Sequence, residues 1–128
     1  MDRRDMRSPL ARASGLGSAK DGATLWWAER VSAVALVPLT LWFVASIIAH
    51  TGSDYDPFIA WLRMPLASSL MILLLVALFY HTALGLQVVI EDYIHSNAKF
   101  AALVLLRISC FALAAVGILA TLRIAFAV

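Results

Sequence analysis

The residues best placed to do chemistry lie in or just after the second of three long apolar segments. His81 lies inside the apolar run of residues 66–90, and Asp92 and Tyr93 follow the run directly. On a helix, Asp92 is about 20° around and about 16 Å along from His81, and Gly85 is one turn from His81 on the same face. A stripe of imidazole, glycine and carboxylate therefore runs along one helix, and Tyr93 begins a second face at its end.

His81 is the only Asp, Glu, Lys, Arg or His residue within that run, and it has two interpretations. An imidazole that loses its water partners inside a bilayer faces a helix interface, a cavity or a cofactor. The first interpretation is a hydrogen bond to a neighbouring helix. The second is an axial ligand of a b-type haem, because such a haem is held by imidazoles that face the interior of a helical bundle. A second imidazole ligand would come from another subunit, since no other histidine lies inside an apolar segment.

Asp92 and Tyr93 also have two interpretations. They form either an ordinary polar helix end or part of a quinone site at the membrane surface. In such a site a phenol donates a hydrogen bond to a quinone carbonyl, and a nearby carboxylate helps to deliver protons. A quinone is soluble in lipid but needs protons for its reduction, so the boundary between membrane and cytoplasm suits both requirements.

The composition predicts an all-α integral membrane protein. Of 128 residues, 62% are hydrophobic and 14% are charged, and the mean hydropathy is +0.88, which is far too apolar for a soluble domain. Three segments are long enough to cross a bilayer: residues 31–49, 66–90 and 101–122. The remaining pieces are too short to form a soluble catalytic domain. The single cysteine, Cys110, excludes a disulfide within the chain and a cluster of cysteine ligands.

The charge distribution predicts the orientation. Six of the ten Lys and Arg residues precede the first span, so the positive-inside rule places the N-terminus in the cytoplasm and the C-terminus outside. We expect residues 1–22 to be a flexible cytoplasmic tail and residues 23–128 to form the three-helix transmembrane domain. Anionic lipid headgroups explain the basic tail better than nucleic acid does, because no stripe of basic and stacking aromatic residues follows.

Two arginines lie near the cytoplasmic ends of spans. Arg30 precedes the first span, as either a snorkelling cation or a counter-charge for an anionic group held between helices. Arg107 lies about 9 Å into the third span, where its guanidinium is expected to reach the headgroups.

The external loop and the third span carry packing signals. The loop sequence FIAWL predicts a short amphipathic segment that lies on the interface and is anchored there by Trp61, with His50 before it exposed to solvent. In the third span, small residues recur on one face and predict close approach of another helix. They are Cys110, Ala114, Gly117 and Thr121.

Taken together, these residues resemble a known family. His81, Gly85 and the sequence VVIEDY, with GSAKDGATLWWAERVSAVAL upstream, resemble the bacterial form of the small hydrophobic membrane anchor of succinate dehydrogenase, respiratory complex II. The resemblance covers about residue 14 to the C-terminus and includes the three-span layout.

The resemblance implies a subunit that is not catalytic alone. It implies that the chain anchors the flavoprotein and iron–sulfur subunits to the bacterial inner membrane beside a companion anchor of the cytochrome b556 type. His81 would ligate the iron of haem b, shared with a histidine of that companion anchor, and Arg30 would lie near the haem propionates. Tyr93 would hydrogen-bond ubiquinone, and Asp92 would border that site.

Other functions remain as alternatives. The chain could be an anchor of a fumarate reductase, or a purely structural anchor without haem or quinone. A small proton-coupled transporter needs a titratable carboxylate within the bilayer. All eight Asp and Glu residues lie outside the three predicted spans, which argues against a transporter.

Overall fold

The computed structural model of the chain describes the backbone of residues 17–127 and the side chains of residues 23–127. Its elements are α2 (Gly17–Ala49), α3 (Tyr55–Arg63), α4 (Pro65–Tyr93) and α5 (Ala98–Ala125). The part of the chain that the structure describes contains no strand. The predicted all-α fold is therefore confirmed.

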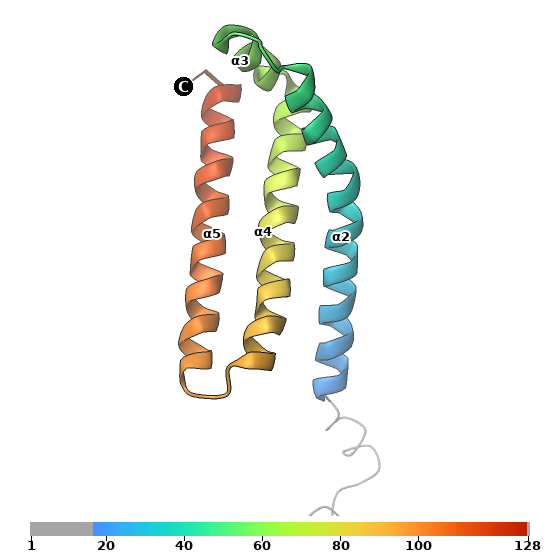
Figure 1. The fold of residues 1–128 in the computed structure, drawn as a ribbon, viewed down its shortest axis with the longest axis vertical. Coiled ribbons are helices and arrows are strands. Elements are labelled where there is room, and N and C mark those ends of the chain that lie inside the picture. The colour runs from blue at the N-terminus through green and yellow to red at the C-terminus, as the bar shows by residue number, and fades with distance from the viewer. Residues whose placement is uncertain (1–16, 128) are drawn as a thin grey trace, which may run out of the picture.

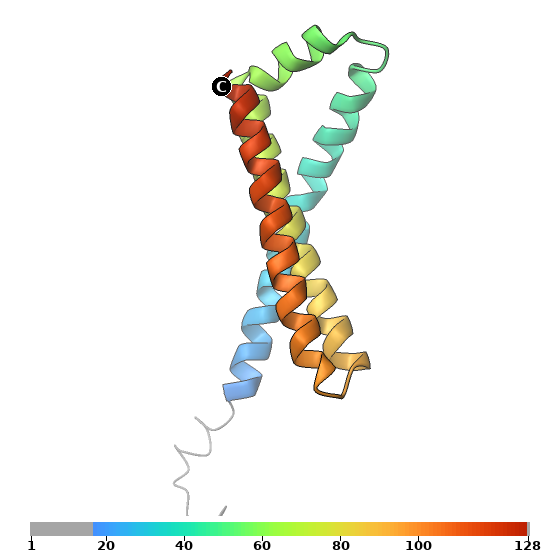
Figure 2. The same ribbon diagram turned by 90° about the vertical axis from the view of Figure 1, so that its left-hand side faces the viewer.

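The long helices form an open bundle organised around α4. Figure 1 shows α4 between α2 and α5, and residue contacts join α4 to both neighbours. Figure 2 shows α2 crossing the α4–α5 pair obliquely, while α3 runs across one end of the bundle and contacts α4 and α5. The end of α4, the start of α5 and the start of α2 lie at the opposite end (Figure 1).

Among the described residues, three helices are long and apolar enough to cross a membrane: Ala23–Ala49, Pro65–Tyr93 and Ala98–Ala125. The predicted number of spans is confirmed, although each helix extends beyond the predicted bounds. Helices of 27 to 29 residues are roughly 40 Å long, so their ends extend past a hydrocarbon core of about 30 Å. Because α2 begins at Gly17, residues 17–22 are helical where we expected the tail to continue. The rest of the predicted flexible tail, residues 1–16, lies outside the described residues.

Two prolines fit these helices in different ways. Pro65 occupies the first turn of α4, where its missing N–H would be unpaired in any case. Pro38 lies inside α2, where it removes one hydrogen bond of the helix. The helix continues through Pro38, and its later part leans toward α3 (Figure 1).

The predicted small-residue face of the third span packs closely against α4. A Cβ atom added at Gly117 would lie 3.1 Å from Cδ1 of Leu75. Thr121, one turn later, is 5% exposed and its hydroxyl donates to the Gly117 carbonyl at 2.9 Å. The small side chains thus allow α4 and α5 to approach each other, as membrane helices do without a hydrophobic driving force.

Aromatic residues pack together at the end of the bundle that carries α3, which differs from the expectation for His50. The predicted amphipathic segment forms the helix α3, and its Trp61 ring lies 4.7 Å from the His50 ring and 5.8 Å from the Trp42 ring. Nδ1 of His50 lies 2.8 Å from the carbonyl oxygen of Ser46. The expectation of a solvated His50 is therefore wrong, because α3 folds back over the end of α2 and partly covers the imidazole.

Candidate functional site

His81 lies where α4 contacts α2, and its side chain has a defined partner. Its Nδ1 is 2.9 Å from Oγ of Ser32. Ser32 is 6% exposed, and its hydroxyl also lies 2.9 Å from the main-chain carbonyl of Glu29, to which it donates. A part-buried polar contact thus joins α2 and α4, and it gives the buried Ser32 hydroxyl the partners it needs.

The other ring nitrogen of His81 remains free to bind something outside this chain. In the described part of the chain, Nε2 forms no hydrogen bond, and the side chain is half-buried. Imidazole is a common ligand of a haem iron and would bind it through a ring nitrogen that carries a lone pair. The structure therefore fits both interpretations of His81, because the helix contact uses Nδ1 and leaves Nε2 available.

Gly85, the next residue of the predicted stripe, lies on an open part of the α4 surface. A Cβ atom added at Gly85 would have nothing within 4 Å. No described helix of this chain therefore approaches Gly85 closely. This leaves room for a partner or cofactor on the helix face that carries His81.

Arg30 lies close to this contact in sequence but not on the same face of α2. Positions 30 and 32 are about 200° apart around a helix. The Arg30 side chain is exposed, and its Cζ lies 5.4 Å from the ring centroid of Trp26, a cation–π distance. No ion pair of Arg30 forms among residues 23–127. The structure does not bring Arg30 to His81, but its guanidinium remains available for a carboxylate from outside the chain.

Tyr93 and Asp92 form the last turn of α4. Tyr93 is 81% exposed, and Asp92 is exposed as well. Neither side chain forms a hydrogen bond with another residue in the described part of the chain. A site built around these two residues therefore has to be enclosed by other subunits.

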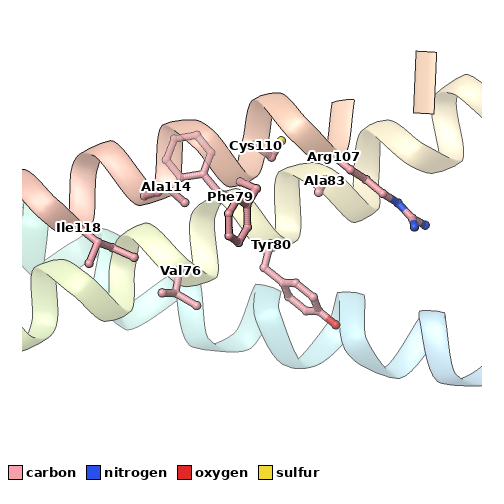
Figure 3. A pocket seen from close by; sticks show the side chains of 10 residues that line it. Val76, Phe79, Tyr80, Ala83, Arg107, Cys110, Ala114 and Ile118 are labelled. Atoms are coloured by element: carbon pink, nitrogen blue, oxygen red, sulfur yellow. The ribbon is translucent and has the colours of Figure 1, made fainter. Parts of the chain in front are cut away.

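Polar side chains near this end also connect α4 to α5. Nε2 of Gln87 donates to Oε1 of Glu91 at 3.0 Å, and Nη2 of Arg107 donates to Oε1 of Gln87 at a long 3.4 Å. We expected Arg107 to reach the headgroups. The side chain does extend toward the end of the bundle where α2 begins (Figure 3), but its guanidinium contacts Gln87 on the way.

Two grooves flank α4 on the face that carries Tyr80. The larger, of about 610 Å³, lies between α2 and α4 and includes Ser32 and Trp27. The other, of about 430 Å³, lies between α4 and α5. Figure 3 shows the second groove, with Phe79 and Tyr80 of α4 opposite Cys110 and Ala114 of α5. Neither groove is lined by His81 or Tyr93, so the chemistry-bearing residues of α4 lie outside both.

The sequence thus indicates His81 but not its partner Ser32. The structure brings His81 together with Ser32, whereas Arg30, Asp92 and Tyr93 remain separate from that pair. One signal for Ser32 was present: a hydroxyl near the start of an apolar span needs a hydrogen-bond partner. Among the described residues no group of three or more His, Cys, Asp or Glu side chains could hold a metal ion, so a metal here would depend on the single ligand His81.

Known proteins match most of this chain. It is 37% identical over 93 residues to the succinate dehydrogenase hydrophobic membrane anchor subunit of Rickettsia bellii, a match that covers 73% of this chain and 74% of the relative. It is 30% identical over 116 residues to the protein of the same name from Paracoccus denitrificans, covering 91% of this chain and 90% of the relative. No solved structure matches the chain.

The family comparison agrees with these relatives. A family model described as succinate dehydrogenase/fumarate reductase transmembrane subunit matches residues 4–125, nearly the whole chain and all three apolar helices. The chain therefore belongs to the family of succinate dehydrogenase/fumarate reductase transmembrane subunits.

Proposed function

We propose that this chain is a non-autonomous subunit of succinate:ubiquinone oxidoreductase. It anchors the flavoprotein and iron–sulfur subunits to the bacterial inner membrane and contributes residues to a haem b site and a ubiquinone site. Family membership, the names of the relatives and three apolar helices support the anchoring role. The described helices hold no soluble domain, so succinate oxidation belongs to partner subunits.

The free Nε2 of His81 carries the proposal for haem. His81 would supply one axial nitrogen to haem b, which when bound carries one electron at a time. His50 follows the end of α2, and His95 is exposed in the turn between α4 and α5. Neither lies in a spanning helix near His81, so a second imidazole would have to come from the companion anchor of the cytochrome b556 type.

Arg30 would neutralise a haem propionate. A carboxylate buried between subunits needs a cation with directed N–H donors, and guanidinium provides them. Arg30 is exposed and rests only on the face of Trp26, so it can turn toward an anionic group without breaking an ion pair within the described chain.

Tyr93 would donate its phenolic hydrogen to a carbonyl oxygen of ubiquinone, and Asp92 would supply a proton path at the membrane surface. Both residues end α4, where a lipid-soluble ring can meet water. Their exposure suits a site whose remaining walls come from the companion anchor and the iron–sulfur subunit.

A reduced-minus-oxidised absorption spectrum of the purified complex tests this function. We expect a b-type α-band in the unmodified complex and its loss or displacement with His81→Ala. Succinate oxidation by an artificial acceptor should stay intact, because it reports only the soluble subunits. A complex that reduces ubiquinone with no α-band would instead show an anchor without haem.

The direction of the reaction is a second question, because the family includes fumarate reductases. The relatives from Rickettsia bellii and Paracoccus denitrificans are both named for succinate dehydrogenase, which favours succinate oxidation. Measuring succinate-driven ubiquinone reduction and quinol-driven fumarate reduction on the same preparation separates the two. A complex that only reduces fumarate would be a fumarate reductase.

A further inference from the structure

Ser32 connects the two helices on which the proposed haem site depends. It lies on α2, 6% exposed, and its Oγ is 2.9 Å from both the Glu29 carbonyl oxygen and Nδ1 of His81. No other described side chain forms a hydrogen bond with His81. The Ser32 hydroxyl is therefore the one group among the described residues that can set the tautomer and orientation of the His81 ring.

The proton count at this contact allows one arrangement that satisfies every atom. A serine hydroxyl has a single hydrogen and two lone pairs, and a carbonyl oxygen can only accept. If the hydroxyl donated to Nδ1, its oxygen and the Glu29 carbonyl oxygen would face each other at 2.9 Å with no hydrogen between them. The hydroxyl must therefore donate to Glu29, and Nδ1–H of His81 must donate to Oγ.

This arrangement fixes the tautomer of His81. A neutral imidazole carries one hydrogen, and that hydrogen is on Nδ1. Nε2 then carries a lone pair, which is what a metal ligand needs, and the bond to Oγ holds the ring plane. Histidines that ligate metals usually donate their other N–H in this way, which orients the ring and raises the basicity of the ligating nitrogen.

We propose that Ser32 is a positioning residue for the haem ligand: its hydroxyl accepts Nδ1–H of His81 and presents the Nε2 lone pair toward the iron. This proposal rests on the proposed haem ligation by His81. Because Ser32 lies on α2 and His81 on α4, the His81 ring is oriented for ligation only when the two helices are packed together.

Removing the acceptor should change the haem without removing it outright. In Ser32→Ala, Nδ1–H loses its partner and the ring can rotate. Nε2 becomes less basic, which favours ferrous over ferric iron. We expect a higher midpoint potential, a changed ferric electron paramagnetic resonance spectrum, and haem affinity lower by about 10- to 100-fold. Ser32→Thr keeps a hydroxyl and should stay close to the unmodified complex in all three measurements.

The chain offers a matched control in Ser68→Ala. Ser68 is another buried serine, 7% exposed, but its hydroxyl contacts only the main-chain carbonyl oxygens of Met64 and Pro65. The loss of a buried hydroxyl alone should therefore leave the haem potential and spectrum unchanged. A shift in Ser68→Ala as large as that in Ser32→Ala would show a general effect of packing and overturn the proposal.

The test uses the complete purified complex with flavin content as the reference for assembly. Absence of haem from the unmodified complex, or normal haem in His81→Ala, would overturn the proposed ligation itself. Normal haem potential and resonance spectrum in Ser32→Ala, with haem lost in His81→Ala, would overturn the role of Ser32 alone.

If the Ser32→Ala complex does not accumulate, the Ser32→Cys variant is measured instead. Its thiol is a weaker acceptor, so a smaller shift in the same direction supports the proposal and no shift overturns it.

Discussion

His81 and Tyr93 share α4 but have different surroundings. The His81 ring contacts Ser32 of α2, whereas Tyr93 ends the helix with 81% of its surface exposed. The two positions are about 18 Å apart along the helix axis. Haem ligation and quinone binding should therefore respond independently to substitutions at these two residues.

Tyr93→Phe should lower quinone reduction while leaving haem unchanged. The substitution keeps the ring but removes the hydroxyl that donates to a quinone carbonyl. An interaction of about 1 to 3 kcal/mol corresponds to a loss of about 5- to 150-fold. The measurement is succinate-driven ubiquinone reduction at limiting quinone, with the haem spectrum recorded on the same preparation.

His81→Ala is the converse control for this experiment. It should alter the haem spectrum, and electrons from the iron–sulfur subunit would still reach quinone if the haem lies off the main path. Undiminished quinone reduction in Tyr93→Phe at limiting quinone would identify the phenol as an interface anchor and remove it from the site.

The isolated chain should not form a haem protein with two histidine ligands. Its spanning helices place one imidazole near the bundle interior, His81, with one free ring nitrogen. The test is to express the chain with and without the companion anchor and to compare the haem absorption spectra of the two preparations in detergent. A complete six-coordinate spectrum from the chain alone would contradict the shared site.

Hydropathy was sufficient to predict the fold, because three long apolar segments have few other ways to satisfy their backbone in a membrane. The residue pattern also located α3 and the small-residue face around Gly117. The ends of the helices were less predictable: α2 begins at Gly17, because helical hydrogen bonding continues beyond the apolar segment that marks the bilayer core.

The sequence alone does not predict the pairing of Ser32 with His81. This pairing depends on the register between two helices whose contact residues are separated by 49 positions, and an apolar pattern does not set that register. His50 was misjudged for a related reason. Its packing against Trp61 follows from the path of the loop, which residue types alone do not determine.

The orientation of the bundle in the membrane is also open to measurement. The cations before the first span predict that α2 begins in the cytoplasm and that three spans place the C-terminus outside. An alkaline phosphatase fused after the last residue should be active, because this enzyme folds only outside the cytoplasm. An inactive phosphatase fusion together with an active cytoplasmic reporter at the same position would reverse the topology.

The two glycines in the spanning helices should tolerate substitution very differently. A Cβ at Gly117 would crowd Leu75 at 3.1 Å, whereas one at Gly85 would meet nothing within 4 Å. Gly117→Leu should therefore destabilise the packing of α4 against α5 by about 1 to 3 kcal/mol, measured by SDS titration of the chain in mixed micelles with fluorescent probes on the two helices. Gly85→Leu should leave the midpoint of the SDS titration unchanged or raise it, since leucine favours helix more than glycine does.

In the assembled complex the same Gly85→Leu change should lower the ratio of haem to flavin, because Gly85 shares the His81 face of α4 that a partner or cofactor would cover. Equal destabilisation of the isolated chain by both substitutions would show that Gly85 also packs within the chain.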